Sequence, residues 1–268
     1  MPIQRARHGW ETSCFCPVGG KRMDRPADYD TSGNYLLSRL SPADLARLKP
    51  HLTAVRLDLR RTFEEPDKPI KHVYFPLDGV VSVVALTSGT QQSEVGLIGR
   101  EGMTGLNIVM GGDRSPHLSY VQVPGRAGLR LSADHLREAM RERPAIQSCF
   151  LHFAQAFMTQ TTHTALANGR GKLEERLARW LLMVHDRLPG NELHLTHEFI
   201  ALMLNVRRAG VTEALRGLTD RGIVTAKRGQ IVVTDRTGLE KHANGLYGIP
   251  EREYLRLIGW RPKHSAGV

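Results

Sequence analysis

The arrangement of apolar and polar positions changes twice along the chain. Between residues 34 and 51, leucines recur at helical spacing, which predicts two short helices. Between residues 53 and 131, short runs rich in β-branched residues follow one another, separated by turns that contain Pro, Gly or Asp. Closely spaced short strands are typical of an antiparallel sandwich or barrel. The helical period returns after residue 132, so we predict an α+β protein that begins with an antiparallel, jelly-roll-like β-roll.

Residues 144–167 carry no charged side chain. Within this stretch, four apolar residues follow a 4-3-4 spacing, which is the seam of a two-stranded coiled coil. These residues are Ile146, Phe150, Phe153 and Phe157. We therefore predict a long dimerisation helix with its dimer seam at these four positions. The alternative is a helix that buries the same face against its own domain.

A helix-turn-helix pattern lies between residues 196 and 218. Thr196 is suited to cap a first helix, and that helix ends at Asn205, a residue type that tolerates the left-handed conformation of a tight turn. A second helix begins near Arg207. Its inward positions are Val211, Ala214, Leu215 and Leu218, and its outward positions are Arg207, Arg208, Ala209, Thr212, Glu213 and Arg216. A second helix with a basic first turn is typical of a motif that enters the major groove of DNA.

A basic hairpin follows the second helix. Residues 222–226 and 230–234 are β-rich and flank the tip Lys227-Arg228-Gly229, as in the wing of a winged helix. Residues 207–228 hold six basic and two acidic side chains, a net charge of +4. This arrangement favours double-stranded DNA as the partner.

These patterns divide the chain into five segments. They are a flexible N-terminal extension (1–30), a β-roll effector or sensor domain (31–143), the dimerisation helix (144–168), a winged helix-turn-helix domain (169–245) and a C-terminal tail (246–268).

Three stretches of the chain resemble the Crp/Fnr family of bacterial transcription regulators. They are HVYFPLDGVVS (72–82), GLIGREGMTG (96–105) and, most strongly, LTHEFIALMLNVRRAGVTEAL (195–215). The resemblance extends over residues 34–243. It implies a homodimer in which the β-roll senses a signal and two recognition helices meet successive major grooves of a palindromic site. RNA polymerase is a further candidate partner, although no contacting surface is identifiable.

The resemblance also implies roles at the DNA. Arg208 occupies the family's base-reading arginine position, and Ala209, Thr212, Glu213 and Arg216 share its outward face. The family typically has a glutamate at the position of Ala209, so we expect a target site different from the best-known family consensus. Contacts to phosphate are expected from Thr196, His197, Arg207, Lys227 and Arg228.

A cyclic nucleotide needs an arginine for its phosphate and a carboxylate for its ribose. Aligned on Gly105, the family's glutamate position holds Leu106, and its arginine falls near Pro116 or His117. Arg114-Ser115 lies two or three positions too early. We therefore expect neither cyclic AMP nor a cofactor, and another small effector stays open. The candidate pocket residues are Gly105, Leu106, Arg114, Ser115, His117, Thr161 and Thr162, the two threonines because they match the family's purine contacts.

Composition agrees with an intracellular DNA-binding protein. The 268 residues include 37 Lys and Arg against 27 Asp and Glu, a net charge of +10. The sequence has neither 18 consecutive apolar residues nor a signal-peptide pattern, so we expect a cytoplasmic protein without membrane association. The cysteines Cys14, Cys16 and Cys149 are too few for a disulfide framework.

Two other classes of protein have to be considered. A cupin-type β-roll enzyme would need a metal constellation such as His-x-His with a downstream Glu, whereas the strand region offers His72 and His117. An iron–sulfur redox sensor would need four thiolates, and the chain has three cysteines. The sequence contains neither a phosphate-binding loop nor a nucleophile elbow. We therefore expect no catalytic residues and no metal site.

Overall fold

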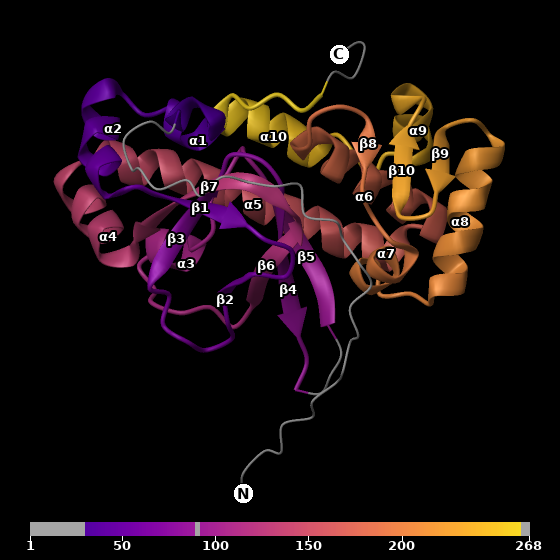
Figure 1. Cartoon of the computed structure of the whole chain (residues 1–268), viewed down its shortest axis with the longest axis horizontal. Coiled ribbons are helices and arrows are strands. Elements are labelled where there is room, and N and C mark those ends of the chain that lie inside the picture. Colours follow the sequence, from indigo (N-terminus) through magenta and orange to yellow (C-terminus); the bar gives the residue numbers. More distant parts are fainter. Residues whose placement is uncertain (1–29, 89–91, 264–268) are drawn as a thin grey trace, which may run out of the picture.

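The computed structural model describes residues 30–88 and 92–263 (Figure 1). These residues begin with the short helical segments η1 (Thr31–Gly33), α1 (Tyr35–Ser38), α2 (Pro42–Leu48) and η2 (Lys49–His51). Asn34 and Ser41 cap α1 and α2, because each side chain accepts a hydrogen bond from the backbone N–H three residues later. The two short helices expected between residues 34 and 51 are confirmed. The expected N-terminal extension, with Cys14 and Cys16, lies outside the described residues except for its last residue.

Two antiparallel sheets form the β-roll. One sheet has the order β1 (Thr53–Leu57), β7 (Gly125–Ser132), β3 (His72–Pro76), and the other has the order β2 (Thr62–Glu64), β6 (Leu118–Val123), β4 (Val80–Leu86), β5 (Gln92–Ile98). The short helices α3 (Leu106–Val109) and α4 (Ala133–Glu142) follow β5 and β7. The expected antiparallel β domain is confirmed. The sequence pattern did not show β2, because three residues are too few to establish an alternation.

Helix α5 (Pro144–Arg170) runs from the β-roll towards the C-terminal domain (Figure 1). Its residues Ile146, Phe150, Phe153 and Phe157 are between 0% and 8% exposed and belong to the apolar core of the β-roll. The prediction of a dimer seam at these four positions is therefore wrong, because a single chain already covers this face.

The side of α5 opposite these four residues is left uncovered by residues 30–88 and 92–263. At about 100° per residue, Leu151, Met158 and Leu166 lie on this side, and all three are exposed. The expected long helix is thus confirmed, but its free apolar face differs from the predicted one.

The C-terminal domain is a winged helix. It contains α6 (Leu173–Arg187), β8 (Glu192–Leu193), α7 (His197–Met203), α8 (Arg208–Asp220), β9 (Val224–Lys227), β10 (Gln230–Val233) and α9 (Arg236–His242). The strands form a small antiparallel sheet in the order β8-β10-β9. Leu177, Leu181 and Val184 of α6 are fully buried in its core.

The segment after the winged helix is not a simple tail. Residues 249–258 form helix α10 (Ile249–Ile258), which lies beside α5 and the β-roll rather than beside the wing (Figure 1). Tyr254 is 1% exposed and packs on Phe153, with 6.2 Å between ring centroids. The Tyr254 hydroxyl accepts a hydrogen bond of 2.7 Å from Gln160 Nε2. The C-terminal segment therefore completes the core of the N-terminal domain.

Across the two described ranges, every helix is too short or too polar to cross a membrane.

Candidate nucleic-acid interface

Helices α7 and α8 form the expected helix-turn-helix. The Thr196 hydroxyl caps α7 by accepting a hydrogen bond of 3.3 Å from the Phe199 N–H. In the turn, Asn205 has a φ of 51°, the left-handed conformation for which asparagine is a suitable residue. The roles predicted for Thr196 as a cap and for Asn205 as a turn residue are confirmed.

Helix α8 buries one face and exposes the other. Its inward residues Val211, Ala214, Leu215 and Leu218 are at most 3% exposed, as the apolar spacing predicts. All the outward candidates are exposed, namely Arg207, Arg208, Ala209, Thr212, Glu213 and Arg216. A row of polar side chains on a helix held from behind by an apolar core is what readout in a major groove requires.

The first turn of α8 is tied to α7 by polar contacts. Arg208 Nε lies 2.7 Å from Glu198 Oε1, and both side chains are about two-thirds exposed. The hydroxyl of Thr212 lies 3.0 Å from His197 Nδ1. An exposed pair of this kind contributes about 0.2–1 kcal/mol, so a base or a phosphate can displace the carboxylate from Arg208. The sequence analysis missed Glu198, although its position in the helix before the turn could have suggested this partner.

The wing has the predicted basic tip. Strands β9 and β10 pair in register from Val224 opposite Val233 to Lys227 opposite Gln230. Gly229 closes the turn with a φ of 72°, which side chains other than glycine rarely adopt. Lys227 and Arg228 are both exposed, and β9 packs beside α8, so the wing extends the basic surface of that helix.

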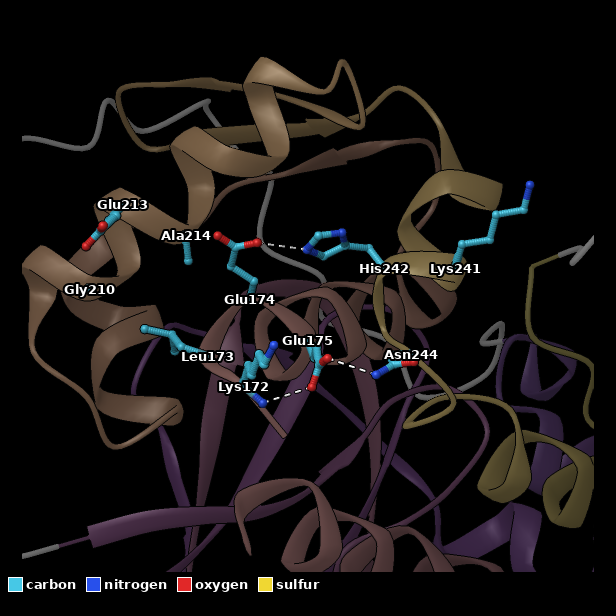
Figure 2. A pocket seen from close by; sticks show the side chains of 10 residues that line it. All are labelled: Lys172, Leu173, Glu174, Glu175, Gly210, Glu213, Ala214, Lys241, His242 and Asn244. Carbon is cyan, nitrogen blue, oxygen red and sulfur yellow. Dashed lines mark hydrogen bonds and ion pairs between the residues drawn. The ribbon is translucent and has the colours of Figure 1, made fainter. Parts of the chain in front are cut away.

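A groove of about 610 Å³ lies behind α8, at the junction of α6 and α9. Figure 2 shows Glu174 directed towards His242 and Glu175 directed towards Asn244. Glu174 Oε2 lies 3.1 Å from His242 Nε2, and Asn244 Nδ2 donates a hydrogen bond of 2.9 Å to Glu175 Oε1. These contacts join the start of α6 to the end of α9 and its following turn within the winged-helix domain.

A second pocket, of about 630 Å³, lies in the β-roll between its strands, α3 and α5. Of the predicted effector residues, it brings together Leu106, Ser115, His117 and Thr161. Gly105, Arg114 and Thr162 do not line it. Most of its walls are apolar, with contributions from Ile98, Leu151 and Met158 among others.

Three of the predicted effector residues have local partners. Arg114 is exposed and pairs with Asp113 at 3.2 Å. The hydroxyls of Thr161 and Thr162 both donate to the Met158 carbonyl of their own helix. In this structure these three side chains are therefore engaged with their neighbours in the chain.

Glu64 is the acidic residue among the described residues that line the pocket, and the sequence analysis missed it. Its Oε1 accepts a hydrogen bond of 2.7 Å from the Gly105 N–H. Burial raises the pKa of Glu64, and the hydrogen bond from the Gly105 N–H offsets only part of this rise. Neither Arg nor Lys occurs among the described residues that line the pocket. The pocket is therefore poorly suited to the phosphate of a nucleotide.

The residues considered for metal binding lie apart. Within residues 30–88 and 92–263, no three His, Cys, Asp or Glu side chains are grouped to hold a metal ion. Cys149 is a free, half-buried thiol, and burial raises its pKa to about 11. A thiol with a raised pKa is a poor ligand, because metals bind the thiolate.

The architecture defines a class of protein: a β-roll domain joined by a long helix to a winged helix-turn-helix domain. Residues 175–242 match the family model of the Crp-like helix-turn-helix domain. Search of curated proteins found no sequence match to the chain. The chain therefore carries a Crp-like helix-turn-helix domain, and the following comparisons concern its fold as a whole.

Solved structures of Crp/Fnr regulators share this fold. A transcriptional regulator assigned to the Crp/Fnr family from Eubacterium rectale is 18% identical, with a TM-score of 0.61, over 79% of this chain and 100% of that one. FixK2 from Bradyrhizobium japonicum is 19% identical, with a TM-score of 0.62, and the match covers 71% of this chain and 96% of that one. The c-di-GMP responsive regulator CLP from Xanthomonas campestris is 17% identical, with a TM-score of 0.58, and the match covers 72% of this chain and 99% of that one. The chain thus has the fold of the Crp/Fnr transcription regulators, as the sequence resemblance implied.

Proposed function

We propose that this protein is a sequence-specific DNA-binding transcription regulator. The observation that carries the proposal is that α8 has two different faces. Its apolar residues are buried, and its outward residues, among them Arg208, Thr212 and Arg216, are exposed. The match of this region to a Crp-like helix-turn-helix domain supports it. The function requires no catalytic step, because regulation arises from different affinities of an effector for two arrangements of the protein.

At the DNA, the outward residues would divide into two groups. Arg208, Thr212 and Arg216 would face base edges, because α8 presents them in one row, and arginine pairs bidentately with guanine. Thr196, His197, Arg207, Lys227 and Arg228 would contact phosphates around that row and fix the position of the protein without reading sequence. Ala209 offers a methyl group, which suits a contact with the methyl group of thymine.

The regulator would bind as a homodimer through the free side of α5. Leu151 and Met158 are seven residues apart on this side, which is the heptad repeat of a helix pair. The stretch around them is uncharged. Two chains related by a two-fold axis would present two α8 helices to a palindromic site, with half-sites about one helical turn apart.

The pocket in the β-roll would hold an uncharged, largely apolar effector. Its apolar walls and the absence of Arg and Lys from its described lining favour such a molecule. Glu64, with a raised pKa, is suited to exchange hydrogen bonds with a neutral group. We expect cyclic AMP to leave DNA binding unchanged.

Selection from random duplex DNA tests this function. The purified protein is equilibrated with the duplex pool with and without cyclic AMP, and the enriched site is then titrated at two salt concentrations. Enrichment of a two-fold symmetric motif in both conditions is the expected result. Enrichment only with cyclic AMP would overturn the assignment of the pocket. Weak binding that depends steeply on salt and shows no sequence preference would overturn the regulator itself.

A further inference from the structure

The C-terminal domain is docked on the outer face of the four-stranded sheet. Val80, Leu97 and Val123 of the sheet belong to the same apolar cluster as helices α6 and α7. Figure 1 shows α7 beside β5, and these two elements are in contact. The sensor and the helix-turn-helix are thus in direct contact, in addition to their covalent connection through α5.

A carboxyl group lies inside this interface. Glu94 of β5 is 5% exposed, and its Oε1 accepts a hydrogen bond of 2.7 Å from Trp180 Nε1 of α6. Its other oxygen, Oε2, shares a hydrogen bond with the Ser82 hydroxyl of β4. Both partners are neutral groups, and neither supplies the positive charge that a buried carboxylate requires.

The nearest cations are engaged elsewhere. Arg179 and Arg187 of α6 act on Glu94 electrostatically, but their hydrogen bonds go to the Leu246 carbonyl and to Glu101, respectively. Tyr120 is the titratable group on β6 that faces Glu94, and its burial raises its own pKa to about 12. Strand β4 has no titratable residue, and those of α7 are His197 and Glu198, at the end of the helix away from Met203.

The hydroxyl of Ser82 connects the protonation of Glu94 to α7. Ser82 Oγ lies 3.6 Å from Met203 Sδ of α7, within range of an O–H···S hydrogen bond. A hydroxyl has one proton to donate. If Glu94 is ionised, that proton goes to the carboxylate and the sulfur receives none. If Glu94 is neutral, its own proton bonds to Ser82 Oγ, and Ser82 donates to Met203.

We propose that Glu94 is a proton-operated latch between the β-roll and the C-terminal domain. The neutral acid holds α6 and α7 against β4 and β5, and the carboxylate releases them. The latch itself does not depend on the proposed function. Its consequence does, because a pH-dependent orientation of α8 affects DNA reading only if the protein is a DNA-binding regulator.

The direction of the pH dependence follows from burial. Burial raises the pKa of Glu94 from its ordinary value of 4.5 to about 7, although Ser82, Trp180, Arg179 and Arg187 each offset part of this rise. The docked contact is therefore at full strength below pH 4.5 and weakens as the pH rises to about 7. One pKa unit corresponds to a factor of ten, so the docking equilibrium can change by up to about 300-fold.

Fluorine NMR of the full chain labelled with 5-fluorotryptophan tests the latch. A soluble gadolinium chelate broadens the resonances of exposed tryptophans, and the Trp180→Phe variant identifies the Trp180 signal. We expect Trp180, which is 3% exposed, to be protected at pH 4.5 and broadened at pH 8.5.

Two substitutions isolate the role of Glu94. Glu94→Gln keeps the shape and stays neutral, so Trp180 should be protected at both pH values. Asp44→Asn neutralises a carboxyl that is 5% exposed, like Glu94, but lies in α2 outside this interface, and should behave like the wild type. A Trp180 signal that is protected at pH 8.5 in the wild type, or that responds identically in Glu94→Gln, would overturn the proposal.

A third variant tests the proposal even if Glu94→Gln fails to fold. Ser82→Ala removes the connection to Met203 and should expose Trp180 already at pH 4.5. Continued protection in this variant would contradict the role of Ser82.

Binding to the selected duplex separates this proposal from the proposed function. Equal affinities of wild type and Glu94→Gln at pH 4.5 and different affinities at pH 8.5 are expected. If the protein shows no sequence preference in DNA binding at either pH, but Trp180 responds as expected in the NMR experiment, the proposed regulator function is rejected and the Glu94 latch is retained. Specific DNA binding with identical NMR behaviour of the two proteins would reject the latch alone.

Discussion

Replacing Arg208 with alanine tests the role of α8 at one side chain. Arg208 is two-thirds exposed and makes no packing contact on which the fold depends, so the variant should fold normally. A bidentate contact between arginine and guanine contributes about 1–3 kcal/mol of discrimination. In the free protein the guanidinium pairs with Glu198, and giving up this exposed pair costs about 0.2–1 kcal/mol. We therefore expect a net loss of about 1–2 kcal/mol, or roughly 5- to 30-fold in affinity.

Fluorescence anisotropy measures this loss on the selected duplex and on duplexes with one base pair changed. Arg208→Ala should lower affinity for the selected site and remove the preference at one position in each half-site. Glu198→Gln should raise affinity by up to about 1 kcal/mol, because it frees Arg208 and removes a negative charge near the phosphates. The double variant should lose most of that gain.

Arg221→Ala is a matched control at the other end of α8. The Arg221 guanidinium donates a hydrogen bond to the Gly217 carbonyl and lies 3.8 Å from Glu174, so its position is fixed within the domain. We expect this variant to keep the preference at every base pair. Full discrimination by Arg208→Ala between the selected site and a scrambled duplex would refute the assignment of α8.

Three further predictions concern the wing, the core and the dimer. Alanine at Lys227 and Arg228 should weaken binding evenly across sequences and lower the slope of log affinity against log salt by about 0.9 for each phosphate that the variant no longer neutralises, as measured by salt titration. Phe153→Ala should destabilise the fold by about 3–5 kcal/mol in denaturant unfolding, because the ring is fully buried between Phe157 and Tyr254. Met158→Glu should leave stability unchanged, because this side chain is 63% exposed, and should yield a monomer in analytical ultracentrifugation; a stable dimer would exclude this face of α5.

The local geometry of the helix-turn-helix could be predicted from the sequence. The spacing of Val211, Ala214, Leu215 and Leu218 determines which side of α8 is buried, and the outward residues follow from the same period. Asn205 in the turn and Gly229 at the tip of the wing have the backbone conformations that their residue types favour. These features depend on neighbours within a few residues.

The dimer seam could not be placed from the sequence alone. A 4-3-4 spacing is the same for a coiled coil and for a helix buried in its own chain. The difference arises from β-roll side chains such as Phe75 and from Tyr254, which lies about a hundred residues after Phe153 and covers the same face of α5. The contact of Glu94 with Trp180 likewise joins residues 86 positions apart, without a local pattern that would predict it.

Disulfide trapping on the selected duplex tests most directly whether α8 enters the major groove. Ala209→Cys, at the exposed first turn of α8, is introduced after Cys14, Cys16 and Cys149 have been replaced. Duplexes then carry a thiol tether on a base edge in either the major or the minor groove. The account predicts rapid cross-linking of residue 209 to the major-groove tether, and none for Thr62→Cys on the β-roll. Specific binding of the duplex without that cross-link, or equal cross-linking from both cysteine positions, would contradict it.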